Sequence, residues 1–123
     1  MTERNLYKLH AGICHTLANP KRLEIIESLR TREMSVTELT KVLEISQSNL
    51  SQHLALMRQR GILTSRREGL NVFYSLSNPK ITQACDLMRQ VLLEYLEAGV
   101  ELAREELSKK ETLPRPKTIQ LNS

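Results

Sequence analysis

The sequence predicts a mostly α fold with one small β-hairpin, an α+β architecture in a single small domain. Apolar residues recur at three- and four-residue spacing in five segments, which indicates amphipathic helices. Residues that favour helix starts precede four of these segments, and two strand-like runs flank a glycine. Because 123 residues is the length of one domain, we expect the folded domain over residues 1–107. Residues 108–123 contain two prolines and almost no periodicity, which predicts a flexible tail.

The first two helices are predicted from periodic apolar residues. The first carries its stripe at Leu6, Leu9, Ile13 and Leu17. Asn19 and Pro20 then start a second helix, because Asn can cap a helix whose first internal residue is Pro. We expect that helix to bury Leu23, Ile26 and Leu29.

Two helices joined by a tight turn follow. Ser35 and Glu38 have the spacing of a capping box, which predicts a short helix to about Leu43 with Leu39 and Val42 inward. Ser46 is placed to cap a second helix, which runs to about Arg60 and stops at a glycine.

The helix over residues 46–60 has an unusual outward face. On a helical wheel its buried side is Leu50, Leu54 and Met57, and the opposite side is small and uncharged: Ser48, Gln52, Ala55 and Gln59, flanked by Asn49 and Ser51. A solvated helix usually carries Lys and Glu there. Short amide and hydroxyl groups instead fit a helix that reads base edges in the major groove of DNA.

A β-hairpin comes next, with strands over 62–67 and 71–76. Arg66 and Arg67 stand near its tip, where they are either simply solvated or suited to contacts with DNA phosphates or the minor groove. The net charge of +4 is modest, but its distribution is uneven, with basic residues over 45–75 and an acidic stretch over 94–106. The basic stretch therefore predicts a surface for nucleic acid.

Asn78 and Pro79 start a last helix whose apolar stripe is longer than one small domain can cover. We therefore expect a homodimer, in which the first and last helices bury each other's apolar faces. The expected interface residues are Leu6, Leu9, Ile13, Met88, Leu92, Tyr95 and Leu96.

Composition excludes several other classes of protein. No apolar run is long enough for a membrane span, and the N-terminus lacks the continuous apolar region of a secretory signal, so we expect a cytoplasmic protein. Four aromatic residues are too few for stacking on single-stranded bases. Without a glycine-rich phosphate loop or a nucleophile motif we expect no enzyme and no cofactor. An interaction module that uses the same fold without DNA stays as an alternative.

Three segments together resemble the ArsR/SmtB family of repressors: LANPKRLEIIESL, SVTELTKVLEISQSNLSQHLALMRQRGIL and TSRREGLNVFYSL. The similarity covers roughly Leu6 to Leu96, and SQSNLSQHL with the arginine-bearing hairpin is its most specific part. It implies a winged helix-turn-helix fold, a dimer through the first and last helices, and a recognition helix over 46–60. The hairpin would be the wing, and an inducer would release the operator DNA. Two recognition helices about 34 Å apart predict an imperfectly palindromic double-stranded operator.

The expected DNA contacts divide by chemistry. Ser48 and Gln52 are assigned to base edges, and Ala55 to a thymine methyl group. Lys41 and Arg58 add charge or are simply solvated, and His53 either packs or contacts DNA. Arg22 is expected in an internal ion pair. The full set of expected DNA contacts is Ser46, Gln47, Ser48, Asn49, Ser51, Gln52, Arg66 and Arg67.

The family's known sensor positions are not filled here. Metal sensors place a Cys-x-Cys pair where this chain has Ser35 and Thr37, and the zinc site of the last helix needs histidines that residues 78–97 lack. Persulfide sensors place a thiol in the second helix, where Glu27 stands. No metal site is therefore assigned from the family.

Cys14 and Cys85 leave three interpretations of the effector open. Both fall on apolar faces of the helices expected at the dimer interface, so they are either buried packing residues or thiols that sense sulfur species or oxidants. The third interpretation is a metal or arsenite site in which His10 joins the two cysteines. The sequence does not identify the inducer.

Overall fold

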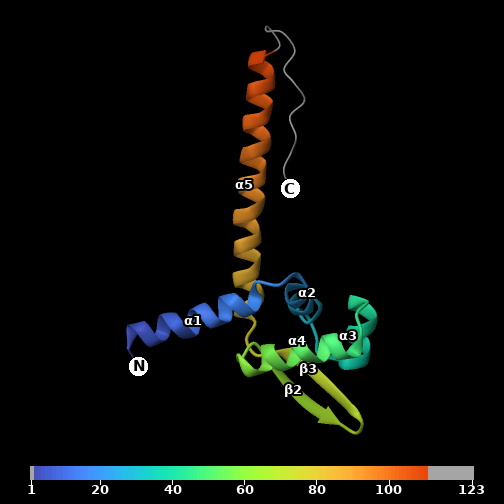
Figure 1. Cartoon of the computed structure of the whole chain (residues 1–123). Coiled ribbons are helices and arrows are strands. Elements are labelled where there is room, and N and C mark those ends of the chain that lie inside the picture. The colour runs from blue at the N-terminus through green and yellow to red at the C-terminus, as the bar shows by residue number, and fades with distance from the viewer. Residues whose placement is uncertain (1, 111–123) are drawn as a thin grey trace. The chain divides into compact units, whose positions relative to one another are not determined.

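The computed structural model describes residues 2–110 and separates into two compact units, the first ending at Ala84 and the second beginning at Cys85. The first unit holds helices α1 (Glu3–Leu17), α2 (Pro20–Ser28), α3 (Val36–Leu43) and α4 (Gln47–Gln59), with strands β1 (Met34–Ser35), β2 (Leu63–Glu68) and β3 (Asn71–Leu76) (Figure 1). Helix α5 (Lys80–Lys110) starts in the first unit and provides all that is described of the second.

The mostly α fold with a β-hairpin is confirmed, but its expected boundaries change. The domain expected over 1–107 spans both units. Helix α5 continues to Lys110, past the point where the tail was expected to begin, so residues 108–110 are helical. Residues 111–123, the rest of the expected tail, lie outside the described residues.

The expected helix caps are confirmed. The Asn19 side chain accepts a hydrogen bond from the Arg22 backbone N–H at 3.2 Å. Ser35 and Glu38 form a reciprocal capping box, and the Ser35 N–H, followed by Arg32, lowers the pKa of the Glu38 carboxyl. Ser46 Oγ accepts from the Asn49 N–H at 3.2 Å. These bonds satisfy N–H groups that a helix start leaves without partners.

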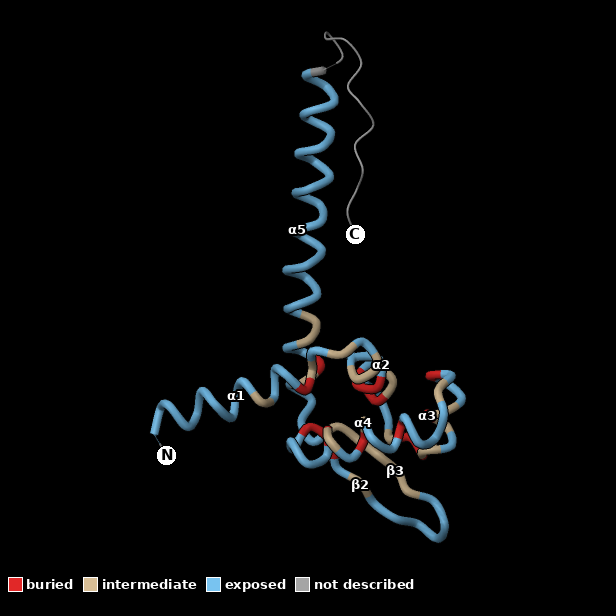
Figure 2. Tube along the Cα trace, in the orientation of Figure 1, coloured by how far each residue is buried: buried red, intermediate tan, exposed pale blue. Residues whose placement is uncertain are grey.

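The core of the first unit lies between α2, α3, α4 and the start of β2 (Figure 2). Leu50, Leu54 and Met57 are buried as expected, together with Ile26, Leu29 and Leu39. Two expectations are wrong, because Leu23 and Val42 are exposed. Their places in the core are taken by Ile25 and Leu43.

The sheet has one strand more than the sequence predicted. Its order is β1-β3-β2, and both pairs are antiparallel. Strand β1 has only two residues, too few for a period-2 pattern to appear in the sequence. The pairing of Glu68 with Asn71 leaves Gly69 and Leu70 as the turn, and Gly69 has the positive φ of 62° that glycine adopts without strain. The side chain of Leu70 is fully exposed at the tip.

Candidate nucleic-acid interface

Helix α4 presents the uncharged face that its sequence predicted. The buried side chains of Leu50 and Met57, each 0% exposed, fix the helix against the core. The opposite side is open to solvent along its whole length, at Ser48, Gln52, Ala55 and Gln59, and the flanking Gln47, Asn49 and Ser51 are exposed as well. Amide and hydroxyl groups on a rigid, exposed helix can donate to and accept from base edges.

The hydroxyl of Ser46 stands at the N-terminus of α4 and has two neighbours. Its oxygen accepts the capping bond from Asn49 and lies 3.4 Å from Ser48 Oγ. A serine hydroxyl keeps one proton to donate while its oxygen accepts. Ser46 can therefore cap the helix and still donate to an anionic oxygen beside it.

The two arginines of the hairpin point to opposite faces of the sheet. Consecutive strand residues alternate between faces, and Arg66 lies opposite Phe73, with its guanidinium 4.5 Å from the ring centroid. Arg67 shares the other face with Ser65, whose hydroxyl accepts from Arg58 of α4 at 3.2 Å. Arg67 is therefore on the face of the sheet that α4 contacts.

Arg66 is held by two carboxylates. Its guanidinium pairs with Glu33, which precedes β1, and donates to Glu68 at 2.7 Å. The hydrogen bond from Arg66 lowers the pKa of the Glu33 carboxyl, and both carboxylates raise the pKa of Arg66 above its ordinary value. Among the described residues, no acidic group pairs in this way with Arg67, which is exposed. The two arginines differ in their availability to an outside anion.

Arg22 and His53 contact each other, which the sequence did not predict. Arg22 Nε donates to His53 Nδ1 at 3.1 Å, and Arg22 Nη1 donates to the Thr16 carbonyl at 3.2 Å. The ion pair expected for Arg22 is therefore replaced by an uncharged imidazole and a carbonyl. His53 is half-buried, and burial, followed by the charge of Arg22, lowers its pKa.

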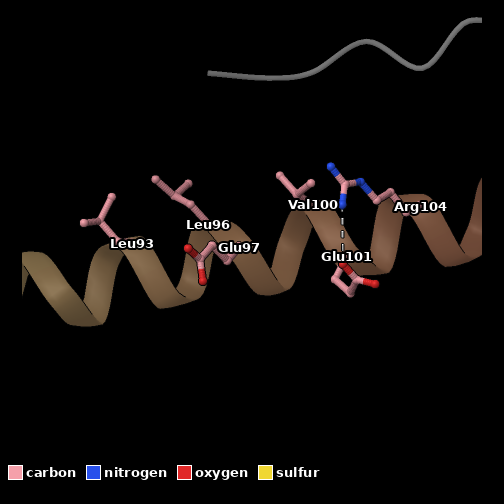
Figure 3. Close-up of a pocket in the computed structure, with 6 residues that line it drawn as sticks. All are labelled: Leu93, Leu96, Glu97, Val100, Glu101 and Arg104. Carbon is pink, nitrogen blue, oxygen red and sulfur yellow. Dashed lines mark ion pairs between the residues drawn. The ribbon is translucent and has the colours of Figure 1, made fainter.

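Each unit carries an exposed apolar surface. In α1, Leu6, Leu9 and Ile13 are all exposed, as are Met88, Leu92, Tyr95 and Leu96 in α5. Two further apolar residues of α5, Leu93 and Val100, were not predicted from the sequence; they line one side of the helix with Leu96, next to the ion pair of Arg104 and Glu101 (Figure 3). Exposed apolar faces of this extent mark contacts with another macromolecule.

The candidate effector residues lie in different units. Cys14 of α1 is exposed, and Cys85, the first residue of the second unit, is half-buried. Within residues 2–110, no three His, Cys, Asp or Glu side chains are grouped so that they could hold a metal ion. Nor does the described part of the chain contain a helix of the length and apolarity that crossing a membrane requires.

Comparison with known proteins places the chain in a family. Residues 19–65 match the family described as "Bacterial regulatory protein, arsR family". The chain is 39% identical over 97 residues to the HTH-type transcriptional regulator Rv0081 of Mycobacterium tuberculosis, covering 78% of this chain and 85% of Rv0081. It is 43% identical to the transcriptional activator HlyU of Vibrio cholerae (61% and 69% covered) and 35% identical to the transcriptional repressor PagR of Bacillus anthracis (66% and 82% covered).

Solved structures agree with this placement. The crystal structure of Rv0081 superposes with a TM-score of 0.71 at 40% identity, covering 77% of this chain and 96% of that one. A homodimeric winged helix-turn-helix DNA-binding domain of Mycobacterium bovis, Mb0332, superposes with a TM-score of 0.70 at 25% identity, covering 80% and 93%. The fold and the exposed α4 face define a DNA-binding winged-helix regulator rather than an enzyme. The chain belongs to the arsR family of bacterial regulatory proteins.

Proposed function

We propose that the chain is a repressor that binds an imperfectly palindromic operator as a homodimer. One observation carries this proposal: the exposed side of α4 is uncharged and rich in amides and hydroxyls, while its other side is fixed in the core. In the winged-helix arrangement such a helix enters the major groove. Relatives include both an activator and a repressor, and repression follows if the operator overlaps a promoter.

Each residue of the interface has a proposed role. Gln52 makes a bidentate contact to adenine, Ser48 reads an adjacent base edge, and Ala55 meets a thymine methyl group. Ser46 and Ser51 donate to phosphates beside the groove. Gln47 and Asn49 complete the contact surface of the first turn of α4.

We assign different roles to the two arginines of the wing. Arg67 lies on the α4 side of the hairpin with no carboxylate partner among the described residues, so it is available to a phosphate. Arg66 is engaged by Glu33 and Glu68, and a phosphate would have to displace both. Arg66 therefore holds the wing, and Arg67 contacts the DNA.

The dimer is proposed to form through the apolar faces of α1 and α5. Seven apolar side chains on these helices are exposed in the single chain: Leu6, Leu9, Ile13, Met88, Leu92, Tyr95 and Leu96. In a dimer with a two-fold axis, both chains would bury the same residues. The homodimeric state of Mb0332, a structural neighbour, supports the proposal of a dimer.

Selection from a pool of random duplexes tests the proposed function. The protein should enrich an inverted repeat, and log K for that repeat should fall steeply with log salt, by about 0.9 for each neutralised phosphate. A protein-interaction module without DNA binding would enrich no sequence and would show no such salt dependence.

The hairpin gives a prediction that separates the two arginines. Replacing Arg67 by Ala should weaken all duplexes about equally and reduce the salt slope by about 1 for each lost phosphate contact. Replacing Arg66 by Ala should leave the salt slope unchanged, because its charge is already matched by Glu33 and Glu68. Filter binding at several salt concentrations measures both slopes. The assignment is wrong if Arg66→Ala lowers the slope and Arg67→Ala does not.

For the effector we propose thiol chemistry at Cys14 and Cys85 that loosens the dimer and releases the operator. Cys14 is exposed on the same helix as the proposed interface, so a modified thiol there would change that interface. A coupling free energy of about 1–3 kcal/mol between thiol state and DNA binding would be sufficient for a switch.

Cysteine replacements separate the three effector interpretations. Operator binding by wild type, Cys14→Ser and Cys85→Ser should be measured with reductant, an organic polysulfide, arsenite and zinc. We expect polysulfide to weaken binding by wild type at least about fivefold and to leave one or both variants unaffected. A loss with arsenite or zinc alone would favour the metal interpretation, and an identical response of all three proteins would make the cysteines packing residues.

A further inference from the structure

Arg22 joins three helices of the first unit through its side chain. It lies in the first turn of α2 and is half-buried. Its guanidinium donates to the Thr16 carbonyl in the last turn of α1 and to the His53 imidazole in α4. Thr16 is itself buried, at 1% exposure. The N–H donors of the planar guanidinium are held in a fixed geometry. Arg22 therefore sets the distance between the Thr16 carbonyl and the His53 imidazole.

The position of His53 gives this contact a consequence for DNA. His53 follows Gln52, the proposed base-reading residue, and precedes the buried Leu54. At the other end of the contact, Thr16 lies in the last turn of α1, the helix that carries the proposed dimer surface of Leu6, Leu9 and Ile13. A link between these two points therefore connects the dimer helix with the helix that reads DNA.

The hydrogen bond also fixes the protonation state of His53. Nδ1 accepts from Arg22, so it carries no hydrogen, and the imidazole is neutral with its proton on Nε2. Protonation would place a second N–H donor and a positive charge opposite the guanidinium. Among the described residues, Arg22 is the charged group that lowers the pKa of the His53 imidazole, after the effect of burial.

We propose that Arg22 and His53 are positioning residues through which the end of α1 orients α4 on DNA, and that specific operator binding requires the neutral imidazole. This inference rests on the proposed function and deepens it. It adds a contact, distant from the base edges, that controls affinity for the operator.

The sign of the pH effect follows from the direction of the shift. Burial and Arg22 hold the pKa of His53 below its ordinary 6.5, so the folded protein binds fewer protons there than the unfolded chain. The neutral His53 imidazole therefore contributes fully to the stability of the folded state above its ordinary pKa. That contribution is lost as the pH falls through the lowered pKa of the folded protein. Specific binding should fall over the same window. Binding to unrelated duplex should not fall, because a new positive charge favours any phosphate.

The test compares wild type, His53→Asn and Arg22→Lys on the selected operator and on a scrambled duplex, from about pH 8 to about pH 5.5. The Asn carbonyl oxygen can take the place of Nδ1 as acceptor but does not titrate. Lys keeps the charge but has no fork with which to reach both partners. His15→Asn, which removes an exposed imidazole of α1, is the matched control.

In wild type and in His15→Asn, we expect the ratio of operator to scrambled affinity to fall at least about fivefold on acidification. In His53→Asn that ratio should stay near the wild-type neutral value at every pH. In Arg22→Lys it should be reduced already at neutral pH. The inference is overturned if His53→Asn keeps the wild-type pH profile, or if Arg22→Lys binds like wild type.

A second measurement needs no DNA. It can therefore be made even if a variant binds the operator too weakly for a comparison. The imidazole resonances of His53, followed by NMR across the same pH range, should give a pKa below 6.5 in wild type and a higher one in Arg22→Gln. An unchanged His53 pKa in folded Arg22→Gln would overturn the inference. If wild type selects no duplex at all, the proposed function fails, and the NMR comparison still decides whether Arg22 holds His53 neutral.

Discussion

Replacing Leu92 by Glu should separate the dimer and abolish operator binding. Leu92 is exposed in the single chain, and in the proposed dimer it is buried against the partner. A buried carboxylate without a partner costs about 3–5 kcal/mol, and two-fold symmetry introduces it twice. The dimer dissociation constant should therefore rise at least about 100-fold. Sedimentation velocity across a range of protein concentrations measures this change.

A matched replacement separates the interface from a general effect of charge. Val42 on α3 is a comparably exposed apolar residue outside the proposed interface, so Val42→Glu should leave the dimer intact. Circular dichroism should show that both variants keep their helices. A dimeric Leu92→Glu, with the mass and affinity of wild type, would remove α5 from the interface.

The second large effect is expected at the DNA. Replacing Gln52 by Ala removes a bidentate contact worth about 1–3 kcal/mol from each half-site where it is made, so each lost contact lowers operator affinity by about 5- to 150-fold. Affinity for unrelated duplex should be unchanged, because the amide carries no charge. The variant should also tolerate substitutions at the base pair that Gln52 reads, and a repeat of the random selection would reveal which position that is.

Gln59 offers the control for this prediction. It has the same side chain on the same exposed face, at the C-terminal end of α4. Recognition helices contact bases mainly through their N-terminal residues, so Gln59→Ala should change operator affinity much less. Equal losses in Gln52→Ala and Gln59→Ala would contradict the proposed orientation of α4 in the groove.

Local signals in the sequence were sufficient for much of the fold. Asn19, Ser35 and Ser46 each act within a few residues of their own position, and all three form the caps that their spacing predicted. The buried side of α4 was also predictable, because a helix of more than three turns repeats its apolar pattern enough to define one face. The uncharged side then followed from the same wheel.

Contacts between residues that are far apart in the sequence could not be predicted from these local signals. Helices α2 and α3 are short, so their patterns allowed two choices of inward face, and packing selected Ile25 and Leu43 over Leu23 and Val42. The bonds of Arg66 to Glu33 and of Arg22 to His53 join residues 33 and 31 positions apart. Only the folded chain brings those partners together, and both contacts change the role assigned to an arginine.

The spacing of the two recognition helices tests the central claim most directly. Once selection has identified a half-site, inverted repeats can be prepared with centre-to-centre spacings of about 10, 13, 15 and 20 base pairs. Affinity should be greatest at one spacing near a whole turn of DNA and should fall at least about 100-fold half a turn away, with two chains bound per duplex. Equal affinity at every spacing, or one chain per duplex, would contradict a two-fold dimer that reads DNA through paired α4 helices.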